Sequence, residues 1–283
     1  MTKTITIIGA GGMMGKWFSN YFLNAGYQVT GHDSEKPVIK SIINSDSLIG
    51  SILKADFVLL STPTKKTPEI IRLISKEMKR GACLIDIASQ KSKTATALAK
   101  MPAKISPICV HPMFGPGTKT MKNQNIISIP IKDGKKELTM AKSLFVGANF
   151  VTIDSSEHDK KIALILGLTH LLNIAFANIL AKDDKIKLTE KMAGTTFKAQ
   201  KIISESILTE SPELIETIIS NPDIRRVAED FSKDVGRLLT DAQEGKSEEI
   251  IAYINSSKEK ISQNVDLEKS YKKLTKMVNI IEK

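Results

Sequence analysis

Two hydrophobic patterns divide the chain near residue 154. Before that point, short apolar runs alternate with segments, such as residues 66–79 and 134–147, whose apolar positions recur at helical spacing. The runs predict buried strands, and the segments between several of them predict covering helices. The predicted strands are "TITIIG", "YQVTGHD", "DFVLLSTP", "ACLIDIAS", "KISPICVHP", "NIISIPI" and "NFVTID". This alternation is typical of an α/β fold built on a doubly wound parallel sheet.

The strand pattern ends after Asp154. The segment "SSEHDKKIALI" is typical of a capped helix start, and apolar residues then recur at helical spacing to the end of the sequence. A chain of 283 residues is long enough for two domains with a core each. We therefore expect an α/β domain over residues 1–154 and an all-helical domain over residues 155–283.

The most apolar stretch of the second half, residues 162–181, is about long enough to span a bilayer. Thr169, His170, Asn173 and Asn178 interrupt it, and charged residues flank it on both sides. Polar residues at this frequency favour a buried helix at a domain core or a dimer interface over a membrane span.

Composition narrows the class of ligand. Hydrophobic residues make up 41% of the chain and charged residues 25%, and the net charge of +10 favours anionic ligands. The lysines are scattered rather than clustered, so we expect a small anionic ligand and no nucleic-acid partner. Cys83 and Cys109 lie inside apolar runs, and the N-terminus lacks the long apolar region of a signal peptide. We expect a cytoplasmic protein with two buried thiols and neither a disulfide nor a metal site.

A glycine-rich stretch, "TIIGAGGMMGKW", lies between the first predicted strand and the first predicted helix. Such a turn presents backbone N–H groups and a helix N-terminus to a pyrophosphate. Any tight strand-to-helix turn also uses glycine, and the third glycine of the usual pattern falls on Met14, with Gly15 one place later. Together with the acidic residue described next, the stretch predicts a Rossmann-type dinucleotide loop formed by Gly9, Gly11, Gly12, Met13 and Met14.

Asp33 ends the second predicted strand, roughly 20 residues beyond the glycines, where such loops place an acid. Its carboxylate is expected to accept hydrogen bonds from the ribose hydroxyls on the adenine side of the cofactor. Because the same charge repels a 2′-phosphate, NAD is favoured over NADP. Lys36 lies close enough in sequence to keep NADP open.

Polar residues gather at the carboxyl ends of the later strands, which in a doubly wound sheet line the ligand crevice. The histidine in "HPMFGPG" is held between prolines and glycines, as a side chain with a fixed task would be. Taken singly, a serine here can cap a helix, a lysine can be a surface charge and a histidine can be a loop residue. Their shared location favours a binding site comprising Ser61, Thr62, Pro63, Ser89, Lys91 and His111.

The motifs "IIGAGGMMG", "DIASQK" and "HPMFGP" together resemble the prephenate dehydrogenase family over essentially the whole chain. The resemblance implies NAD-dependent oxidative decarboxylation of prephenate, a small dianionic substrate of tyrosine biosynthesis, by a homodimer joined through its helical domain. It implies that His111 is the catalytic histidine, Ser89 the active-site serine and Lys91 a substrate-contacting lysine. His170 matches a further family histidine, and a hydrogen-bonded core histidine is the alternative there.

One position departs from the family pattern. Where the family usually places a substrate-binding arginine, this chain has Ser206. Lys198 and Lys201 lie upstream, and Lys198 is two helical turns from Ser206, so it falls nearer the same face. We expect Lys198 to bind the distal carboxylate, with Arg225 or Arg226 as the fallback. The departure leaves open whether the substrate is prephenate or its amino analogue, arogenate.

Two other functions remain compatible with the sequence. A different two-domain dehydrogenase, of the 3-hydroxyacid type, would be expected to rely on a lysine in its helical half and would leave "HPMFGP" without a role. A non-catalytic NAD-sensing protein would need the glycine loop alone. The presence of Ser89, Lys91 and His111 favours an enzyme over a sensor.

Overall fold

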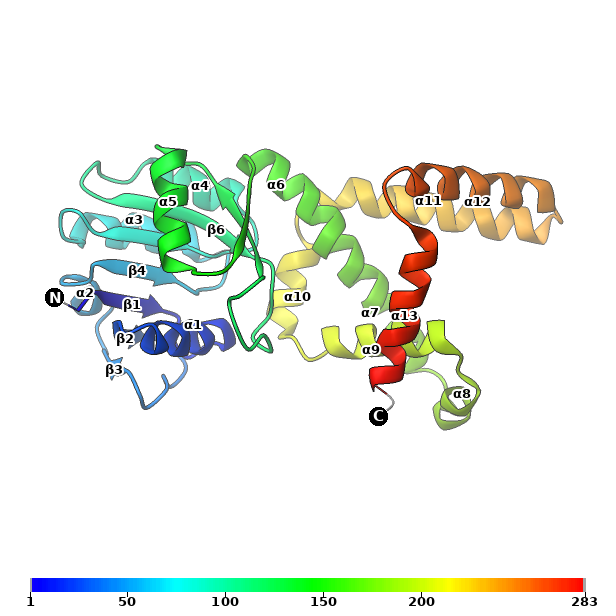
Figure 1. The fold of residues 1–283 in the computed structure, drawn as a ribbon, viewed down its shortest axis with the longest axis horizontal. Coiled ribbons are helices and arrows are strands. Elements are labelled where there is room, and N and C mark those ends of the chain that lie inside the picture. The colour runs from blue at the N-terminus through cyan, green and yellow to red at the C-terminus, as the bar shows by residue number, and fades with distance from the viewer. Residues whose placement is uncertain (1, 282–283) are drawn as a thin grey trace. The chain divides into compact units, whose positions relative to one another are not determined.

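The computed structural model describes residues 2–281 as two compact units, Met1–Ile162 and Ala163–Lys283. All strands of the described chain belong to the first unit, and the second consists of helices (Figure 1). The α/β and all-helical regions predicted from the hydrophobic pattern are therefore confirmed. The units divide after Ile162, so that α6 (Ser155–Ile162) lies in the first unit, where it packs against α4 (Ser92–Ala99).

The first unit is built on one eight-stranded sheet with the order β3-β2-β1-β4-β5-β6-β7-β8. Each of the seven predicted runs forms a strand, and the two-residue β3 is an addition that the pattern did not indicate. The strands are β1 (Thr4–Ile8), β2 (Gln28–His32), β3 (Ile43–Asn44), β4 (Phe57–Leu60), β5 (Cys83–Asp86), β6 (Ser106–Pro112), β7 (Asn125–Ile129) and β8 (Asn149–Thr152).

The sheet is mostly parallel, with one reversal. β6 pairs antiparallel with β7, and β7 pairs parallel with β8, so the last two strands run against the other six. A parallel neighbour would require a crossover connection, usually a helix, and residues 113–124 form none. The reversal therefore follows from the helix-free connection after β6, and it leaves His111 beside the turn-forming "MFGPG" segment.

Helices cover both faces of this sheet and bury alternate strand residues. On one face, Phe18 and Phe22 of α1 (Met13–Asn24) and Phe145 after α5 (Gly134–Leu144) pack against residues such as Ile7 and Ile85. On the other, α3 (Thr67–Glu77) and α4 pack against Val58, Leu60 and Leu84, and α2 (Leu48–Ile52) contributes there as well. Burial on both faces explains why the strands read as continuous apolar runs.

Both cysteines lie at the centre of this sheet. Cys83 begins β5 and Cys109 lies in the neighbouring β6, and each has 2% of its surface exposed. Both are free thiols, as expected from their apolar surroundings. Cys109 Sγ lies 3.6 Å from the carboxylate of Asp86, the residue opposite it in the strand register.

The second unit contains seven helices and one π-helical segment within the described residues. α9 packs against α7 and α13, while α11 packs against η1 and α12. Their bounds are η1 (Ala163–Leu168), α7 (Thr169–Leu180), α8 (Ile186–Met192), α9 (Thr195–Ile207), α10 (Pro212–Ile219), α11 (Ile224–Gln243), α12 (Ser247–Ser262) and α13 (Leu267–Ile281).

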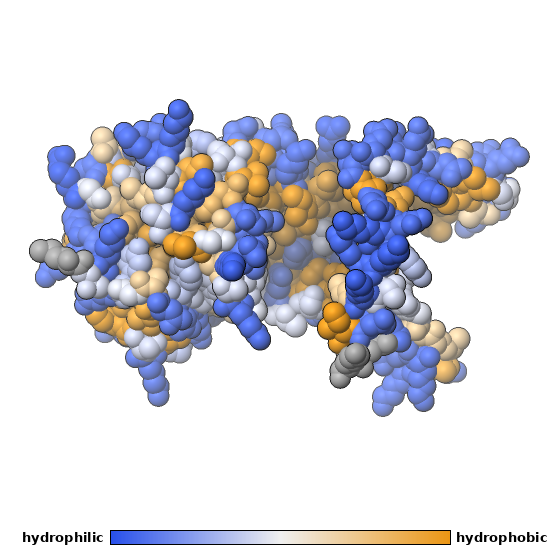
Figure 2. Space-filling view, in the orientation of Figure 1, coloured by the Kyte–Doolittle hydropathy of each residue, from blue (hydrophilic) through white to orange (hydrophobic). Residues whose placement is uncertain are grey.

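The apolar helix surface of the second unit is only partly covered within the single chain. Among the described residues, the helical stretch Ser155–Leu180 is the one segment long and apolar enough to cross a membrane, yet 33% of its most apolar window is buried within the protein. We expected residues 162–181 to be buried at a domain core or a dimer interface. Within the single chain several of its apolar side chains reach the surface, as do others on α11 and α12 (Figure 2). The exposed apolar residues include Leu164, Ile165, Ile179, Val235, Leu239, Ile251 and Ile254.

Candidate functional site

The turn from β1 to α1 contains approaches that only glycine permits. Gly9 has a φ of +82°, in the left-handed region, and a Cβ there would lie 2.3 Å from the carbonyl oxygen of Ser61. A Cβ on Gly15 would lie 2.0 Å from the carbonyl oxygen of Gly9. Gly15, in the first turn of α1, is therefore the glycine that brings the helix close to β1. The sequence pattern placed that glycine at position 14, and the structure moves it one residue later, past Met14.

The N-terminus of α1 has no side-chain cap. Gly12 is its N-cap residue, and its first turn carries no acidic side chain. The leading N–H groups of a helix have no partner within the helix, and the helix dipole makes this end favourable for an anion. Met13, the first residue of α1, has 48% of its surface exposed. The loop thus meets the requirements of a phosphate-binding turn.

Asp33 lies beside this loop and holds it from the other side. Its Oδ2 accepts a hydrogen bond of 2.9 Å from the N–H of Gly11, and its Oδ1 accepts from the N–H groups of Glu35 and Lys36. Burial alone would raise the pKa of Asp33, but these N–H donors lower it, so the carboxylate is anionic. A cavity of about 490 Å³ opens next to it, lined by residues that include Asp33, Ser34, Lys36, Val38, Ile42 and Asn44.

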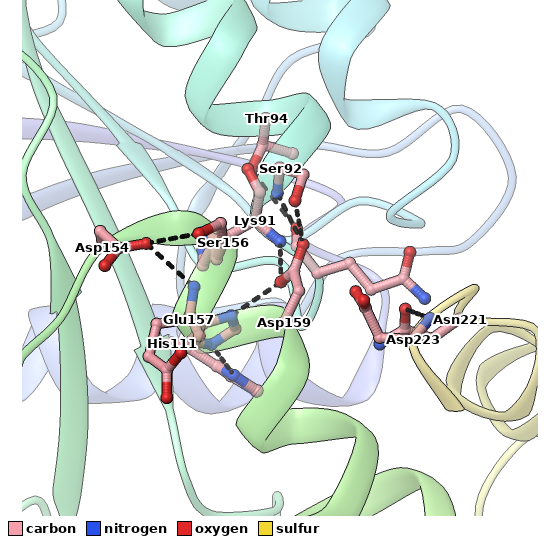
Figure 3. A network of polar contacts seen from close by, with 12 residues as sticks. Lys91, Ser92, Thr94, His111, Asp154, Ser156, Glu157, Asp159, Asn221 and Asp223 are labelled. Atoms are coloured by element: carbon pink, nitrogen blue, oxygen red, sulfur yellow. Dashed lines mark hydrogen bonds and ion pairs between the residues drawn. The ribbon is translucent and has the colours of Figure 1, made fainter. Parts of the chain in front are cut away.

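His111 is a buried residue of β6, with 5% of its surface exposed and Ile127 of β7 opposite it in the register. Its Nδ1 lies 3.0 Å from Nε2 of His158, and Nδ1 of His158 lies 2.8 Å from Oδ1 of Asp159 (Figure 3). Burial lowers the pKa of His111 well below its usual value, and the positive charge of Lys91 and the ring of His158 lower it further. The imidazole of His111 is therefore neutral at physiological pH and can act as a base.

Asp159 ties this chain of rings to the start of α4. Its carboxylate accepts hydrogen bonds from the N–H of Lys91 at 2.8 Å, from the N–H of Ser92 at 2.9 Å and from the Ser92 hydroxyl. Burial alone would raise the pKa of Asp159, but the hydrogen bonds from His158, Ser92 and Lys91 lower it to about 2. An anionic side chain from α6 thus caps the N-terminus of α4.

α6 itself is held in place by a cap of its own. Oδ1 of Asp154 accepts from the N–H and the hydroxyl of Ser156 and from the N–H of Glu157, at 2.9–3.0 Å (Figure 3). This is the capped helix start that "SSEHDKK" predicted. The cap sets where α6 begins, and so it places His158, one turn later, opposite His111.

Lys91 lies inside the protein. None of its surface is exposed, and its Nζ donates to Oδ2 of Asp86 at 2.8 Å and to the carbonyl oxygen of Val110 at 2.6 Å. The surface-charge alternative for Lys91 is therefore wrong. Its contact with a substrate stays a prediction, because in this structure the ammonium joins the end of β5 to the strand that carries His111.

The other strand-end residues lie where the sequence placed them. Ser61 follows β4 and its N–H donates to the carbonyl oxygen of Ile8 in β1, next to the glycine loop. The Thr62 hydroxyl pairs with that of Thr67 at 2.9 Å, and Pro63 accepts from the first N–H groups of α3. Ser89 is half-buried after β5, and the ring of His111 is hydrogen-bonded to His158 rather than to it.

Comparison with known proteins places these features in one family. Residues 26–154 match the model of the prephenate dehydrogenase nucleotide-binding domain, and residues 154–256 match that of the prephenate dehydrogenase dimerization domain. The chain is also 30% identical over 241 residues to "Probable arogenate/prephenate dehydrogenase" of Methanocaldococcus jannaschii. It belongs to the prephenate/arogenate dehydrogenase family.

The extent of the likeness differs between these relatives. The alignment with the M. jannaschii protein covers 81% of this chain and 54% of that one, so the chain spans about half of its relative's length. Prephenate dehydrogenase of Aquifex aeolicus, solved with hydroxyphenyl propionate and NAD⁺, has a TM-score of 0.73 at 22% identity, covering 93% of this chain and 98% of that one. Synechocystis arogenate dehydrogenase has a TM-score of 0.66 at 15% identity, covering 93% and 100%. At such identities the solved structures establish the fold alone.

The family-implied residues of the helical unit can be placed within that unit. His170, in α7, is buried, with Nδ1 2.7 Å from the carbonyl oxygen of Leu166 and Nε2 3.3 Å from the carboxylate of Glu210. The hydrogen bond to Glu210 raises the pKa of His170 against the opposing effect of burial. Both partners are acceptors, so both ring nitrogens donate. This matches the core-histidine alternative, and a substrate contact by His170 stays a prediction.

Lys198 and Ser206 both lie in α9 of this prephenate/arogenate dehydrogenase family member. Lys201, the neighbouring candidate, is tied to Glu190 at 2.9 Å and to Glu205 at 2.5 Å. The Ser206 hydroxyl donates back to the carbonyl oxygen of Ile203. Binding of the substrate's distal carboxylate by Lys198 stays a prediction.

His158 and Asp159 are the site residues that sequence reasoning missed. They belong to the segment "SSEHDKK", which reads as the charged start of a helix. No local signal marks them, because neighbouring residues are only about 100° apart on a helix and can both lie on its solvent-exposed face. In the structure they have 1% and 5% of their surface exposed.

Proposed function

We propose that this protein catalyses the NAD-dependent oxidative decarboxylation of prephenate to 4-hydroxyphenylpyruvate, a step of tyrosine biosynthesis, in the cytoplasm. The observation that carries the proposal is a buried, neutral imidazole, His111, on the same sheet as an uncapped glycine loop. Family membership and the Aquifex complex with NAD⁺ and an aromatic ligand support it.

The glycine loop and Asp33 fit NAD. Such a cofactor needs backbone positions without side chains, which Gly9 and Gly15 provide, and an uncapped helix N-terminus for its pyrophosphate. It also needs an acceptor for its ribose hydroxyls, and the anionic carboxylate of Asp33 lies beside a cavity for the adenosine half. When bound, NAD⁺ supplies the acceptor for the hydride. The charge of Asp33 favours NAD over NADP, and Lys36 on the same loop is the residue that would favour the phosphate.

His111 supplies the base. Prephenate carries a ring alcohol opposite a carboxylate, and loss of hydride and CO₂ from it produces an aromatic ring, which drives the reaction forward. Nε2 of His111, the ring nitrogen that does not face His158, would accept the proton of this alcohol. Holding the base rigidly in a strand keeps it in register with the alcohol, and we propose that Ser89 helps to orient that alcohol.

The choice between prephenate and arogenate depends on groups that bind the substrate's distal carboxylate and side chain. A dianion in a partly dry cleft needs a cation, because an unpaired buried charge is costly. We propose Lys198 for that role, with Arg225 or Arg226 as the fallback. Arg225 is largely exposed, whereas Lys198 is half-buried, and the half-buried position suits a partly dry cleft better.

We propose that the protein is a homodimer joined through its helical unit. The family model for residues 154–256 describes a dimerization domain. Apolar side chains such as Leu164, Ile165 and Ile179 are about half exposed or more, and exposed apolar surface of this extent usually marks an interface. Light scattering should give twice the monomer mass of 31.1 kDa at micromolar concentration, and a monomer would contradict the proposal.

Incubation of the purified protein with NAD⁺ and either prephenate or arogenate tests the function. We expect NADH absorbance to rise with prephenate, with CO₂ released in equal amount. Turnover of arogenate alone would reassign the substrate and leave the reaction type in place. Turnover of a simple 3-hydroxyacid instead, or NAD⁺ binding with no turnover of any of these compounds, would show a different dehydrogenase or an NAD-sensing protein.

A further inference from the structure

His158 and Asp159 have no part in the reaction as proposed so far, yet they are the groups bonded to the base. The contacts run from His111 Nδ1 to His158 Nε2 at 3.0 Å, and from His158 Nδ1 to Asp159 Oδ1 at 2.8 Å. Resting on the proposed function, we propose that His158 is a positioning residue for His111 that also takes over the proton which His111 removes from the substrate alcohol, with Asp159 as its counter-ion.

The hydrogen-bond partners fix which nitrogen of each ring carries the proton. Asp159 is ionised and accepts from four donors, so it can only accept from His158, and Nδ1 of His158 must carry the proton. Nε2 of a neutral His158 then has a lone pair and accepts from Nδ1–H of His111. The remaining nitrogen of His111, Nε2, is therefore unprotonated. The chain of contacts sets the tautomer that a general base requires.

The electrostatic environment favours a positive charge on His158 over one on His111. The charged and titratable groups that face His111 are Lys91, from the segment between β5 and α4, and His158 and Asp159 from α6. Burial and Lys91 both disfavour an imidazolium at His111, although Asp86 partly offsets the charge of Lys91 through their ion pair. His158 lies in direct contact with the Asp159 carboxylate, so the same charge there is paired.

One proton passes from the substrate alcohol into the histidine pair, and one proton moves between the two rings. His111 Nε2 gains the proton of the substrate alcohol, and the Nδ1 proton of His111 moves to Nε2 of His158. His111 ends neutral in its other tautomer, and His158 ends as an imidazolium beside anionic Asp159. The hydride and CO₂ leave as in the proposed reaction, and loss of one proton from the pair to water restores the starting state. No group beyond those of the proposed reaction is needed.

The His158→Gln variant distinguishes proton uptake by His158 from purely structural support of His111. The Gln amide oxygen can still accept from His111 Nδ1–H, but it cannot take a proton. We expect kcat to fall roughly 10–100-fold, within the range of general acid–base effects, while KM for both substrates changes by less than about twofold. Lys160→Ala, which also alters α6 but lies at an exposed position outside the contacts of His111, should keep kcat near that of the wild type.

The pH profile gives a readout that a purely structural role would not move. In the wild type, a proton gained by His111 can be passed to His158 and held there beside Asp159. In His158→Gln, His111 titrates alone, buried and close to Lys91, so the acid limb of the kcat/KM profile should move to lower pH by about one unit or more. Retention of wild-type kcat, or an unmoved acid limb, overturns the inference.

A measurement on the wild type keeps the inference testable if the variant does not fold. Long-range ¹H–¹⁵N spectra of the four histidines, assigned by single substitutions, report which ring nitrogen is protonated. We expect the Nδ1–H tautomer for both His111 and His158, and a proton on Nε2 of His111 would overturn the inference. A wild-type protein with no turnover of prephenate or arogenate contradicts the proposed function, whereas a fully active His158→Gln contradicts this inference alone.

Discussion

Two helices of the α/β unit begin after carboxyl ends of parallel strands in one sheet. They differ in whether a side chain binds the N–H groups at the helix N-terminus. α1 follows β1 with glycine as its N-cap residue and no side-chain cap. α4 follows β5, and its first N–H groups are bound by the carboxylate of Asp159 from α6. A helix N-terminus attracts anions in either case. In α1 that attraction is left for a ligand, and in α4 it has been used for a permanent tertiary contact.

The difference between the two helix N-termini indicates that cofactor binding and the chemical step belong to different places along the sheet. The α1 end has the features of a nucleotide site, with glycines, a helix N-terminus without a side-chain cap and Asp33. The α4 end is closed and polar inside, with a buried ion pair between Lys91 and Asp86 and a histidine chain that reaches Asp159. Changes at the first end should therefore alter cofactor affinity, and changes at the second should alter turnover or stability.

The largest effect is expected at the chemical end. His111→Asn removes the base and should reduce kcat roughly 10²–10⁴-fold. NAD⁺ binding should stay nearly intact, because His111 lies in β6, away from the glycine loop. Steady-state kinetics and a cofactor titration by fluorescence would check both parts. A variant with near-normal kcat would remove His111 from the mechanism and would contradict the assignment of the chemistry to the α4 end.

At the binding end, Gly9→Ala should weaken NAD⁺ binding with little change in the environment of His111. The new Cβ would lie 2.3 Å from the carbonyl oxygen of Ser61, so the loop must move, and strain of about 1–3 kcal/mol corresponds to roughly a 10–100-fold higher Kd. Gly26→Ala is the matched control, because Gly26 has nearly the same φ, +81°, but nothing within 4 Å of the added atom. Equal effects of the two changes on Kd would mean that the close approach is unimportant.

A lysine of the helical unit should affect binding of the substrate without altering the cofactor site at α1 or the histidine chain at α4. Lys198→Met should raise KM for prephenate about tenfold or more, as expected for a lost charged hydrogen bond of roughly 1.5–3 kcal/mol, and should leave NAD⁺ affinity unchanged. Lys201→Met is the control, since Lys201 is held by Glu190 and Glu205 and is expected to have less effect on KM. If KM is unaltered in Lys198→Met, the cation comes from elsewhere.

The preference between NAD⁺ and NADP⁺ tests the role of Asp33 at the binding end. The wild type should prefer NAD⁺ over NADP⁺ in kcat/KM, and Asp33→Ser should reduce that preference about tenfold by removing the repulsion of the 2′-phosphate. Because Asp33 also holds the N–H of Gly11, some loss of NAD⁺ affinity should accompany the change. A wild-type preference for NADP⁺ would mean that Ser34 and Lys36 dominate the pocket.

The smallest effect concerns stability in acid. The pKa of Asp159 is lowered to about 2 in the folded protein, below its value in the unfolded chain, so its contribution is present above pH 4 and is lost as the pH falls towards 2. Asp159→Asn should cost roughly 1–2 kcal/mol near neutral pH, and the difference from the wild type should shrink in acid. Denaturant titrations of both proteins at several pH values would reveal a constant difference if the cap carries no charge effect.

The sequence predicted the parts of the structure that depend on local pattern. Apolar runs located seven strands, and the glycines, Asp33 and His111 marked the carboxyl ends of three of them, because turn geometry and strand ends leave signs within a few residues. The reversal at β7 was not foreseen, since it depends on the absence of a helix in the connection after β6. The register of the third glycine was misplaced by one residue because the pattern describes spacing rather than the contact between Gly15 and Gly9.

The remaining errors concern long-range contacts. The sequence favoured a binding-site role for Lys91 and left a surface charge as the alternative, and only the fold brings Asp86 and Val110 to its ammonium. His158 and Asp159 are 47 and 68 residues from their partners His111 and Lys91, and no periodicity links positions so far apart. For residues 162–181 the sequence left a domain core and a dimer interface open, because an apolar helix pattern does not say how much of the helix is covered within one chain.

The two cysteines at the centre of the sheet provide a reporter of its opening. Burial raises the pKa of Cys83 to about 12, with a smaller contribution from Glu137, and burial likewise raises the pKa of Cys109 far above that of a free thiol. Thiols of this kind are inert towards alkylating reagents until the strands around them separate. The rate of labelling at β5 and β6 therefore measures how often the middle of the sheet opens. Cofactor binding, which stabilises the closed form, should slow that rate in proportion to its occupancy.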